Sequence, residues 1–294
     1  MSRVEVKKTY KLYIGGAFPR SESGRSYEVA DAKGRFLANA AAGSRKDARD
    51  AVVAARKAQP GWSGATAYNR GQVLYRVAEV MESRKAQFAE EVRAAEGLTP
   101  ARAAAAVDAA IDRWVWYAGW SDKFQQVLGG LNPVAGPYFN ISASEPTGVV
   151  AALAPQESSL LGLVSVVAPI VVSGNTAVVL TSRERPVPAI TLAEALATSD
   201  VPGGVVNIIT GNPAEAAPWL ASHRDVNAID LTGVAGTDID WADLERAAAD
   251  NLKRVRRPAS GPDGAVEPDW TLTPDLSRLE ALLETKTVWH PKGR

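Results

Sequence analysis

The middle of the chain alternates between short apolar runs and helical stretches. The apolar runs lack a polar residue at every second position, which is typical of strands buried on both faces of a sheet. Because helical patterns separate these runs, the sequence predicts an α/β fold with a doubly wound parallel sheet. The predicted strands are 148–154, 176–180, 204–209 and 226–231, and the predicted helices are 159–173, 188–198, 214–222 and 241–252.

The first 120 residues have a mostly helical pattern. Ser44 and Asp47 form a capping-box pattern before an Ala-rich helix that we expect to end near Gln59. The three tryptophans of the last predicted N-terminal helix are expected to pack in the core. The other predicted elements of this region are helices at 69–84, 86–95 and 101–120, and a short β-hairpin at 11–18.

The pattern changes again near the end of the chain. The segment 259–270 is rich in Gly, Pro and Asp, which predicts a loop or linker. A short helix is predicted at 275–283, and residues 285–289 alternate like a strand. Since a lone strand is not stable, we expect this one to pair with an edge strand in this subunit or in a neighbour.

Composition excludes several classes of protein. The 294 residues carry 33 basic and 33 acidic side chains, and this balance argues against a nucleic-acid or membrane-surface partner. The absence of cysteine removes disulfides and thiolate chemistry, and two histidines leave little for a metal site, so none is expected. The apolar run 160–172 is too short to span a bilayer, and the polar N-terminus has no signal-peptide pattern. A cytoplasmic protein is therefore expected.

The loop after the first predicted sheet strand lacks the Gly-x-Gly-x-x-Gly fingerprint of dinucleotide-binding folds. In its place stands Pro155-Gln156-Glu157-Ser158-Ser159. Six stretches across 11–257 nevertheless resemble, in order, the NAD(P)-dependent aldehyde dehydrogenase superfamily, whose nucleotide domain lacks that fingerprint. They are LYIGGAF, SASEPTGVVAALAP, SGNTAVVL, DVPGGVVNIITG, LASHRDVNAIDLTG and NLKRV.

This resemblance implies a domain organisation. Residues 1–257 would form a Rossmann-like nucleotide-binding domain with N-terminal helices and an oligomerisation strand near 138–147. Residues 258–274 would be a linker. Residues 275–294 would form a C-terminal oligomerisation helix and strand, because LEALLETKTV resembles the final strand of the family. The large catalytic domain that follows the nucleotide domain in the family would be missing.

The resemblance also implies which catalytic groups are present. The family uses a cysteine nucleophile, an asparagine amide that helps bind the oxyanion, and a glutamate base. Glu157 stands at the amide position, where its negative charge would repel an oxyanion, and Pro258 stands at the base position. The cysteine has no counterpart, so no catalytic residue is expected.

The cofactor-binding residues implied by the resemblance are Glu184, Thr181, Pro155 and Gly233. Thr181 replaces the usual ribose-binding lysine, and Val234 replaces the serine of the turn that faces the cofactor. Each replacement deletes a polar contact. We therefore expect no bound cofactor, although NAD or NADP binding stays an alternative.

Other chemistry-bearing side chains are expected to have structural roles. His223 and His290 are expected at a helix end and at the surface, and Ser158 and Ser159 are expected to cap the next helix. Glu157 and Glu184 could form a carboxylate pair, but capping or solvated roles are favoured. A basic cluster could bind an anion, and a solvated edge or a salt-bridged subunit contact is favoured for it; it comprises Lys253, Arg254, Arg256 and Arg257.

Three functions follow from these observations. The first is a non-catalytic subunit that assembles with itself or supports and regulates a full-length aldehyde dehydrogenase. The second is an NAD(P)-binding protein or sensor, for which Glu184 and the sheet argue. The third is an NAD(P)-dependent aldehyde oxidoreductase with atypical chemistry that needs no cysteine nucleophile.

Overall fold

A five-stranded parallel sheet forms the centre of the computed structural model, in the order β10-β9-β6-β7-β8. The structure describes residues 7–262 and 264–293; residues 1–6, 263 and 294 of the predicted domains lie outside the described part. The doubly wound sheet is confirmed, and β10 adds a strand that the sequence did not predict. The strands are β6 (Val149–Leu153), β7 (Thr176–Leu180), β8 (Val206–Ile209), β9 (Ala228–Asp230) and β10 (Arg254–Arg256).

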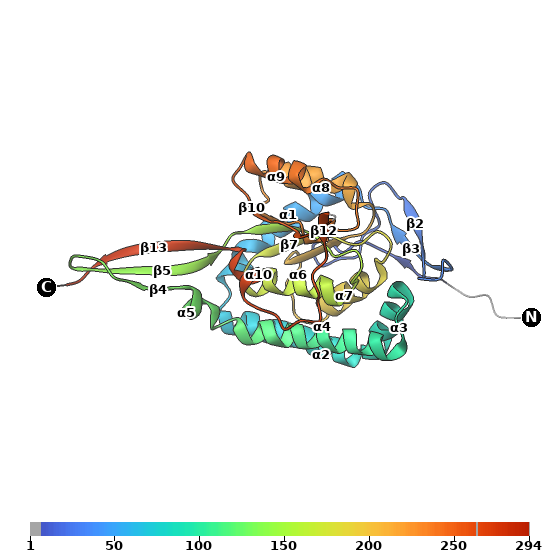
Figure 1. Cartoon of the computed structure of the whole chain (residues 1–294), viewed down its shortest axis with the longest axis horizontal. Helices are drawn as coiled ribbons and strands as arrows, with labels where there is room; N and C mark the ends of the chain where they lie inside the picture. Colours follow the sequence, from blue (N-terminus) through green and yellow to red (C-terminus); the bar gives the residue numbers. More distant parts are fainter. Residues whose placement is uncertain (1–6, 263, 294) are drawn as a thin grey trace, which may run out of the picture.

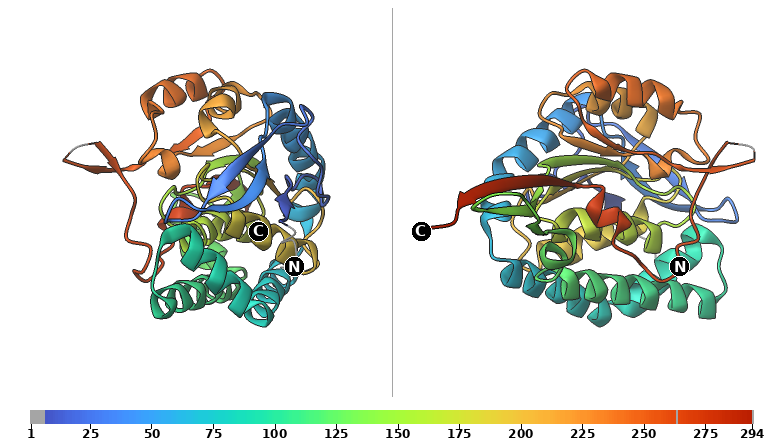
Figure 2. Two further views of the ribbon diagram at one scale, coloured as in Figure 1. Left: turned by 90° about the vertical axis from the view of Figure 1, so that its right-hand side faces the viewer. Right: turned by 60° about the vertical axis from the view of Figure 1, so that its left-hand side comes forward.

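Helices cover both faces of this sheet (Figures 1 and 2). On one face lie α1 (Arg45–Gly64) and α8 (Pro213–Ser222), with α9 (Trp241–Ala249) packed on α8. On the other face lie α6 (Leu161–Val172) and α7 (Val187–Ala197). An outer layer packs on these two and comprises α2 (Ala67–Ser83), α3 (Lys85–Glu96) and α4 (Pro100–Trp120). The predicted helices are confirmed with shifted ends; α1, for example, continues through Pro60.

The sheet separates two hydrophobic cores. Side chains of a strand alternate between its two faces. Val149 and Leu153 of β6 accordingly belong to the core under α1 and α8, whereas Val150 belongs to the core around α6 and the outer helices. Every residue of α6 is buried between the sheet and this outer layer. Trp114 is fully buried in the same core, as expected.

The mostly helical character of the first 120 residues is confirmed, but the sequence did not predict that residues 9–41 form a three-stranded sheet of order β1-β3-β2. The predicted hairpin at 11–18 reduces to one bridge between Ile14 and Ala17, and Tyr13 pairs with Ile208 of β8 instead. The capping box is confirmed, since the Asp47 carboxylate accepts the Ser44 N–H at 2.8 Å. The strands of this sheet are β1 (Thr9–Tyr10), β2 (Ser26–Ala30) and β3 (Phe36–Ala41).

A three-stranded arm projects from the body and carries the described C-terminal end (Figure 1). The predicted final strand is confirmed, and it pairs antiparallel with the strand near 138–147 of this same chain. The helix predicted at 275–283 is shorter than expected. The elements are α5 (Phe124–Leu128), β4 (Gly130–Asn132), β5 (Tyr138–Pro146), α10 (Ser277–Glu280) and β13 (Leu283–Pro291).

The segment predicted as a linker is anchored to the body. It begins with a hairpin of β11 (Ala259–Gly261) and β12 (Gly264–Val266), and then runs past α6 to α4 before reaching α10 (Figure 1). Arg113 of α4 donates to the carbonyl oxygens of Trp270 at 2.7 Å and Leu272 at 3.1 Å. Within the described ranges, no helix has both the length and the apolar character needed to cross a membrane.

Candidate functional site

The loops after β6, β7 and β8 meet at one edge of the sheet, where open α/β sheets bind their ligands. A cleft of about 260 Å³ lies at this edge. Three carboxylates line it, whereas Arg183 is the one cation among its lining residues. The carboxylates are those of Glu157, Glu184 and Asp238. The cleft is therefore a negatively charged site.

Of the four residues that the resemblance implies for cofactor binding, Glu184 lines this cleft with an exposed side chain. Thr181 is 2% exposed, and its hydroxyl donates to the carbonyl oxygen of Ser182 at 3.1 Å. Pro155 is buried and lies against Gly162 of α6. Both Thr181 and Pro155 are thus buried among other residues of the chain, and neither is among the residues that line the cleft.

Gly233 occupies the short 3-10 turn η1 (Thr232–Val234), which packs directly on the end of β6. A side chain at this position would overlap the carbonyl oxygens of Ala154 and Leu153. The glycine is therefore explained by a close backbone approach. Val234 beside it is 2% exposed, so its side chain offers no polar contact to a ligand.

The loop of residues 155–159, called here the strand-end loop, holds Glu157 in an ion pair. The Arg185 guanidinium lies 2.6 Å from the Glu157 carboxylate and also donates to the Glu157 carbonyl oxygen at 2.7 Å. A carboxylate with this partner cannot donate a hydrogen bond to an oxyanion. Glu157 and Glu184 both line the cleft, but Glu157 forms an ion pair with Arg185 and not a carboxylate pair with Glu184.

The two serines of the strand-end loop differ in role. Ser158 caps α6 as expected, because its hydroxyl accepts the Gly162 N–H at 2.9 Å. The expected cap at Ser159 is wrong: its hydroxyl donates to the Glu96 carboxylate at 2.6 Å. Burial raises the pKa of the Glu96 carboxyl group, and a raised pKa is typical of a carboxylate that acts as a general base for a serine hydroxyl. Ser159 is only 3% exposed, however, so its oxygen cannot meet a substrate.

The histidines and the basic cluster have structural contacts. His223 ends α8, where its ring nitrogen accepts the Asp225 N–H at 3.0 Å, and burial lowers its pKa. His290 is exposed and lies within β13. In the basic cluster, Arg254 pairs with Glu284 at 2.7 Å and Arg257 pairs with Glu245 at 2.8 Å. These ion pairs lie within this chain, so the salt-bridged subunit contact stays a prediction.

Sequence reasoning missed two carboxylates near the strand ends. Asp230, at the end of β9, is 1% exposed and pairs with Arg278 of α10 at 3.2 Å. Glu267, in the predicted linker, accepts the backbone N–H groups of Gln156 and of Glu157, the latter at 2.7 Å. Each contact joins residues far apart in the sequence, so no local pattern signals it.

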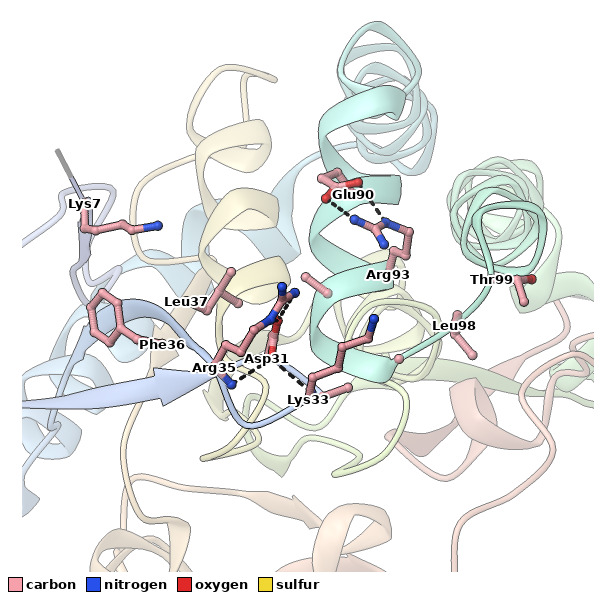
Figure 3. A pocket seen from close by; sticks show the side chains of 13 residues that line it. Lys7, Asp31, Lys33, Arg35, Phe36, Leu37, Glu90, Arg93, Leu98 and Thr99 are labelled. Carbon is pink, nitrogen blue, oxygen red and sulfur yellow. Dashed lines mark hydrogen bonds and ion pairs between the residues drawn. The ribbon is translucent and has the colours of Figure 1, made fainter. Parts of the chain in front are cut away.

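A second cavity, of about 470 Å³, lies between α3 and the turn that joins β2 to β3 (Figure 3). Both of its carboxylates are paired, Asp31 with Arg35 at 2.6 Å and Glu90 with Arg93 at 2.6 Å, and two lysines also line it, Lys7 and Lys33. In residues 7–262 and 264–293, no group of three or more His, Asp or Glu side chains is arranged to hold a metal ion.

The cleft does not fit the diphosphate of a dinucleotide. Arg185 balances the charge of Glu157, which leaves Glu184 and Asp238 against Arg183, and this net negative charge disfavours a ligand with two negative phosphates. Two backbone N–H groups of the strand-end loop are already bonded to Glu267. The buried Thr181 hydroxyl cannot supply the missing ribose contact. Of the residues that the resemblance implies, Glu184 alone is placed to meet a nucleotide here.

Comparisons with known proteins agree with the fold. A model of the aldehyde dehydrogenase family matches residues 18–263. The chain is 34% identical over 256 residues to aldehyde dehydrogenase family 2 member B4 of Arabidopsis thaliana, covering 86% of this chain and 46% of that protein. It is 32% identical to human retinal dehydrogenase 2, covering 86% of this chain and 48% of that protein. The NAD+ complex of a Bacillus cereus aldehyde dehydrogenase superposes with a TM-score of 0.78 at 25% identity, covering 86% of this chain and 53% of that one.

Proposed function

We propose that this chain, which belongs to the aldehyde dehydrogenase family and spans about half the length of the curated relatives it matches, is a non-catalytic subunit. In this role it assembles with itself or with a full-length aldehyde dehydrogenase, which it supports or regulates. The observation that carries the proposal is the state of the strand-end loop. Its Glu157 stands where the resemblance places an oxyanion-binding amide, and this carboxylate is ion-paired to Arg185.

The remaining catalytic positions support the same proposal. The sequence of 294 residues has no cysteine, so the nucleophile that the family uses is missing from it. Pro258, which stands at the position of the base, has no titratable side chain. A nucleotide-binding role would depend on Glu184 alone, in a negatively charged cleft. We therefore favour the assembly role over nucleotide binding.

The arm supplies the surface for assembly. Its register places Val288 of β13 opposite Ile141 of β5, and Leu131 of β4 lies on the other side of Ile141. These three side chains share one face of the arm and are 47%, 46% and 65% exposed. Phe139 lies on the same face, two residues before Ile141, and is 44% exposed. An apolar face of this kind is typical of a protein–protein contact.

The outer edge of the arm adds a second contact. β13 is an edge strand of the three-stranded sheet, and its outer backbone groups pair with no described strand. Such an edge is a template for strand addition from another chain. A second copy, or a full-length aldehyde dehydrogenase with a similar strand, would complete the hydrogen bonding. The apolar face and the free edge together favour a partner from the same family.

Co-expression tests this function. The chain is expressed with a full-length aldehyde dehydrogenase encoded in the same genome, and the complexes are purified through a tag on this chain alone. Multi-angle light scattering is expected to show a stable mixed oligomer, because the arm offers both an apolar face and a pairing edge. A monomer whose mass is unaffected by the full-length protein would refute the proposal.

A further inference from the structure

Residues 267–272, called here the strap, place a carboxylate on the strand-end loop. One oxygen of Glu267 accepts the N–H groups of two consecutive residues, Gln156 and Glu157, the second at 2.7 Å. The other oxygen accepts the indole N–H of Trp270 at 3.1 Å. The Glu267 carboxylate thus has three N–H donors, of which two come from a loop more than a hundred residues earlier in the chain.

The strand-end loop has the geometry of an anion site. Consecutive backbone N–H groups that point at one oxygen form a concavity that favours negative charge. α6, twelve residues long, begins shortly after the loop, and the positive end of its dipole adds to this preference. The Arg185 guanidinium is also held at the loop, by the carbonyl oxygens of Gln156 at 3.3 Å and Glu157 at 2.7 Å. It balances the charge of the Glu157 side chain.

The strap is held in place from its other end. Trp270 is 7% exposed, and the Arg278 guanidinium lies 4.7 Å from its ring centroid. Arg113 of α4 donates to two strap carbonyl oxygens, those of Trp270 and Leu272. These contacts hold the strap against the body through its tryptophan and its backbone. Glu267 is therefore presented to the loop by a segment that is anchored independently of it.

We propose that the strand-end loop is an anion-binding site whose ligand in this chain is its own Glu267 carboxylate. The strap thereby excludes external anions of the carboxylate and phosphate class from the two N–H groups. When the Glu267 carboxylate is removed, the loop accepts a small external phosphate anion in its place. This inference goes beyond the assembly role, because it holds for a monomer as well as for an oligomer.

Hydrogen exchange at the Gln156 and Glu157 amides tests the contact directly. In the wild-type chain both amides are expected to exchange slowly, and in Glu267→Ala they are expected to exchange about tenfold faster or more. Asp269→Ala is the matched control. Its carboxylate lies in the same strap but accepts only from Thr271, so wild-type exchange is expected there. Glu267→Gln keeps an acceptor without the charge and is expected to give intermediate protection.

Inorganic phosphate then probes the vacated site, because it is the small anion that the proposal names. In Glu267→Ala, phosphate is expected to restore slow exchange at both amides, and sodium chloride at matched ionic strength is not. In the wild-type chain phosphate is expected to have no effect, since Glu267 occupies the donors. Equal exchange in the wild type and both Glu267 variants would overturn the proposal. Equal protection of the wild type and Glu267→Ala by phosphate would also overturn it, and so would no protection of the variant. The mass of the oligomer does not enter these readouts.

Discussion

We expect the purified chain to form an oligomer through the arm, and we expect the replacement of Ile141 and Val288 by glutamate to reduce this oligomer to the mass of a single copy. The two side chains face each other across β5 and β13 and are about half exposed. In an assembly through this face they would be buried, and each introduced carboxylate would lose its hydration without gaining a partner. Desolvation of this kind costs several kcal/mol per ion in real proteins, and about 1.4 kcal/mol already weakens association tenfold. Light scattering of the purified variant measures the effect.

A matched variant tests whether the effect depends on the apolar face or only on the added negative charge. Thr285 and Thr287 are exposed on the opposite face of β13, because side chains alternate along a strand. Thr285→Glu with Thr287→Glu adds the same charge to the same strand, and we expect the wild-type mass. The four replaced residues belong to neither core, so circular dichroism is expected to show that both variants are folded. An oligomer that survives the Ile141 and Val288 replacements would show that the apolar face is not the interface.

The Asp230→Ala variant is expected to lose about 3–5 kcal/mol of unfolding free energy, which is the usual cost of removing one partner of a buried ion pair. Asp230 is 1% exposed, and its carboxylate accepts the Thr232 N–H at 2.8 Å and pairs with Arg278 at 3.2 Å. Without Asp230, the half-buried Arg278 guanidinium stays positively charged but has lost the carboxylate that neutralised it. α10, which leads into β13, should then detach from the body. Urea unfolding at equilibrium measures the loss.

A double variant tests whether the ion pair is the cause. Arg278→Met in the Asp230→Ala background removes the unpaired charge and retains apolar contact with the Trp270 ring. The double variant is expected to be more stable than Asp230→Ala alone. A loss below about 1 kcal/mol in Asp230→Ala, or additive losses in the double variant, would contradict this account of how the C-terminal segment is held.

The sequence predicted the central sheet because its strands are mostly apolar runs separated by helical patterns. It did not predict β2 and β3, because SYEVA and FLANAA are short and only weakly alternating, and half of FLANAA is alanine. It also missed β10, whose Arg254 and Arg256 are typical of an exposed edge. The buried strands of the central sheet were therefore predictable, and β13 was predicted from its alternation, whereas the short strands β2, β3 and β10 were not.

The site was predictable only in part. The resemblance located the strand-end loop and placed Glu184 at the cleft, because both follow a strand that the pattern identifies. It also assigned Thr181 to the cofactor, but the direction of a side chain at a strand end depends on packing, and this one is buried. The roles of Glu267 and Asp230 depend on contacts with distant segments, which a single sequence does not reveal.

Reduced-cofactor formation by the purified chain is the most direct test of whether this chain is non-catalytic. The chain, freed of any full-length aldehyde dehydrogenase, is incubated with NAD or NADP and a panel of aliphatic and aromatic aldehydes, and the absorbance of the reduced nicotinamide is followed. The account predicts no reduction above the rate without protein, because the sequence has no cysteine nucleophile and Glu157 is paired to Arg185. Turnover that is proportional to the concentration of this chain would contradict it.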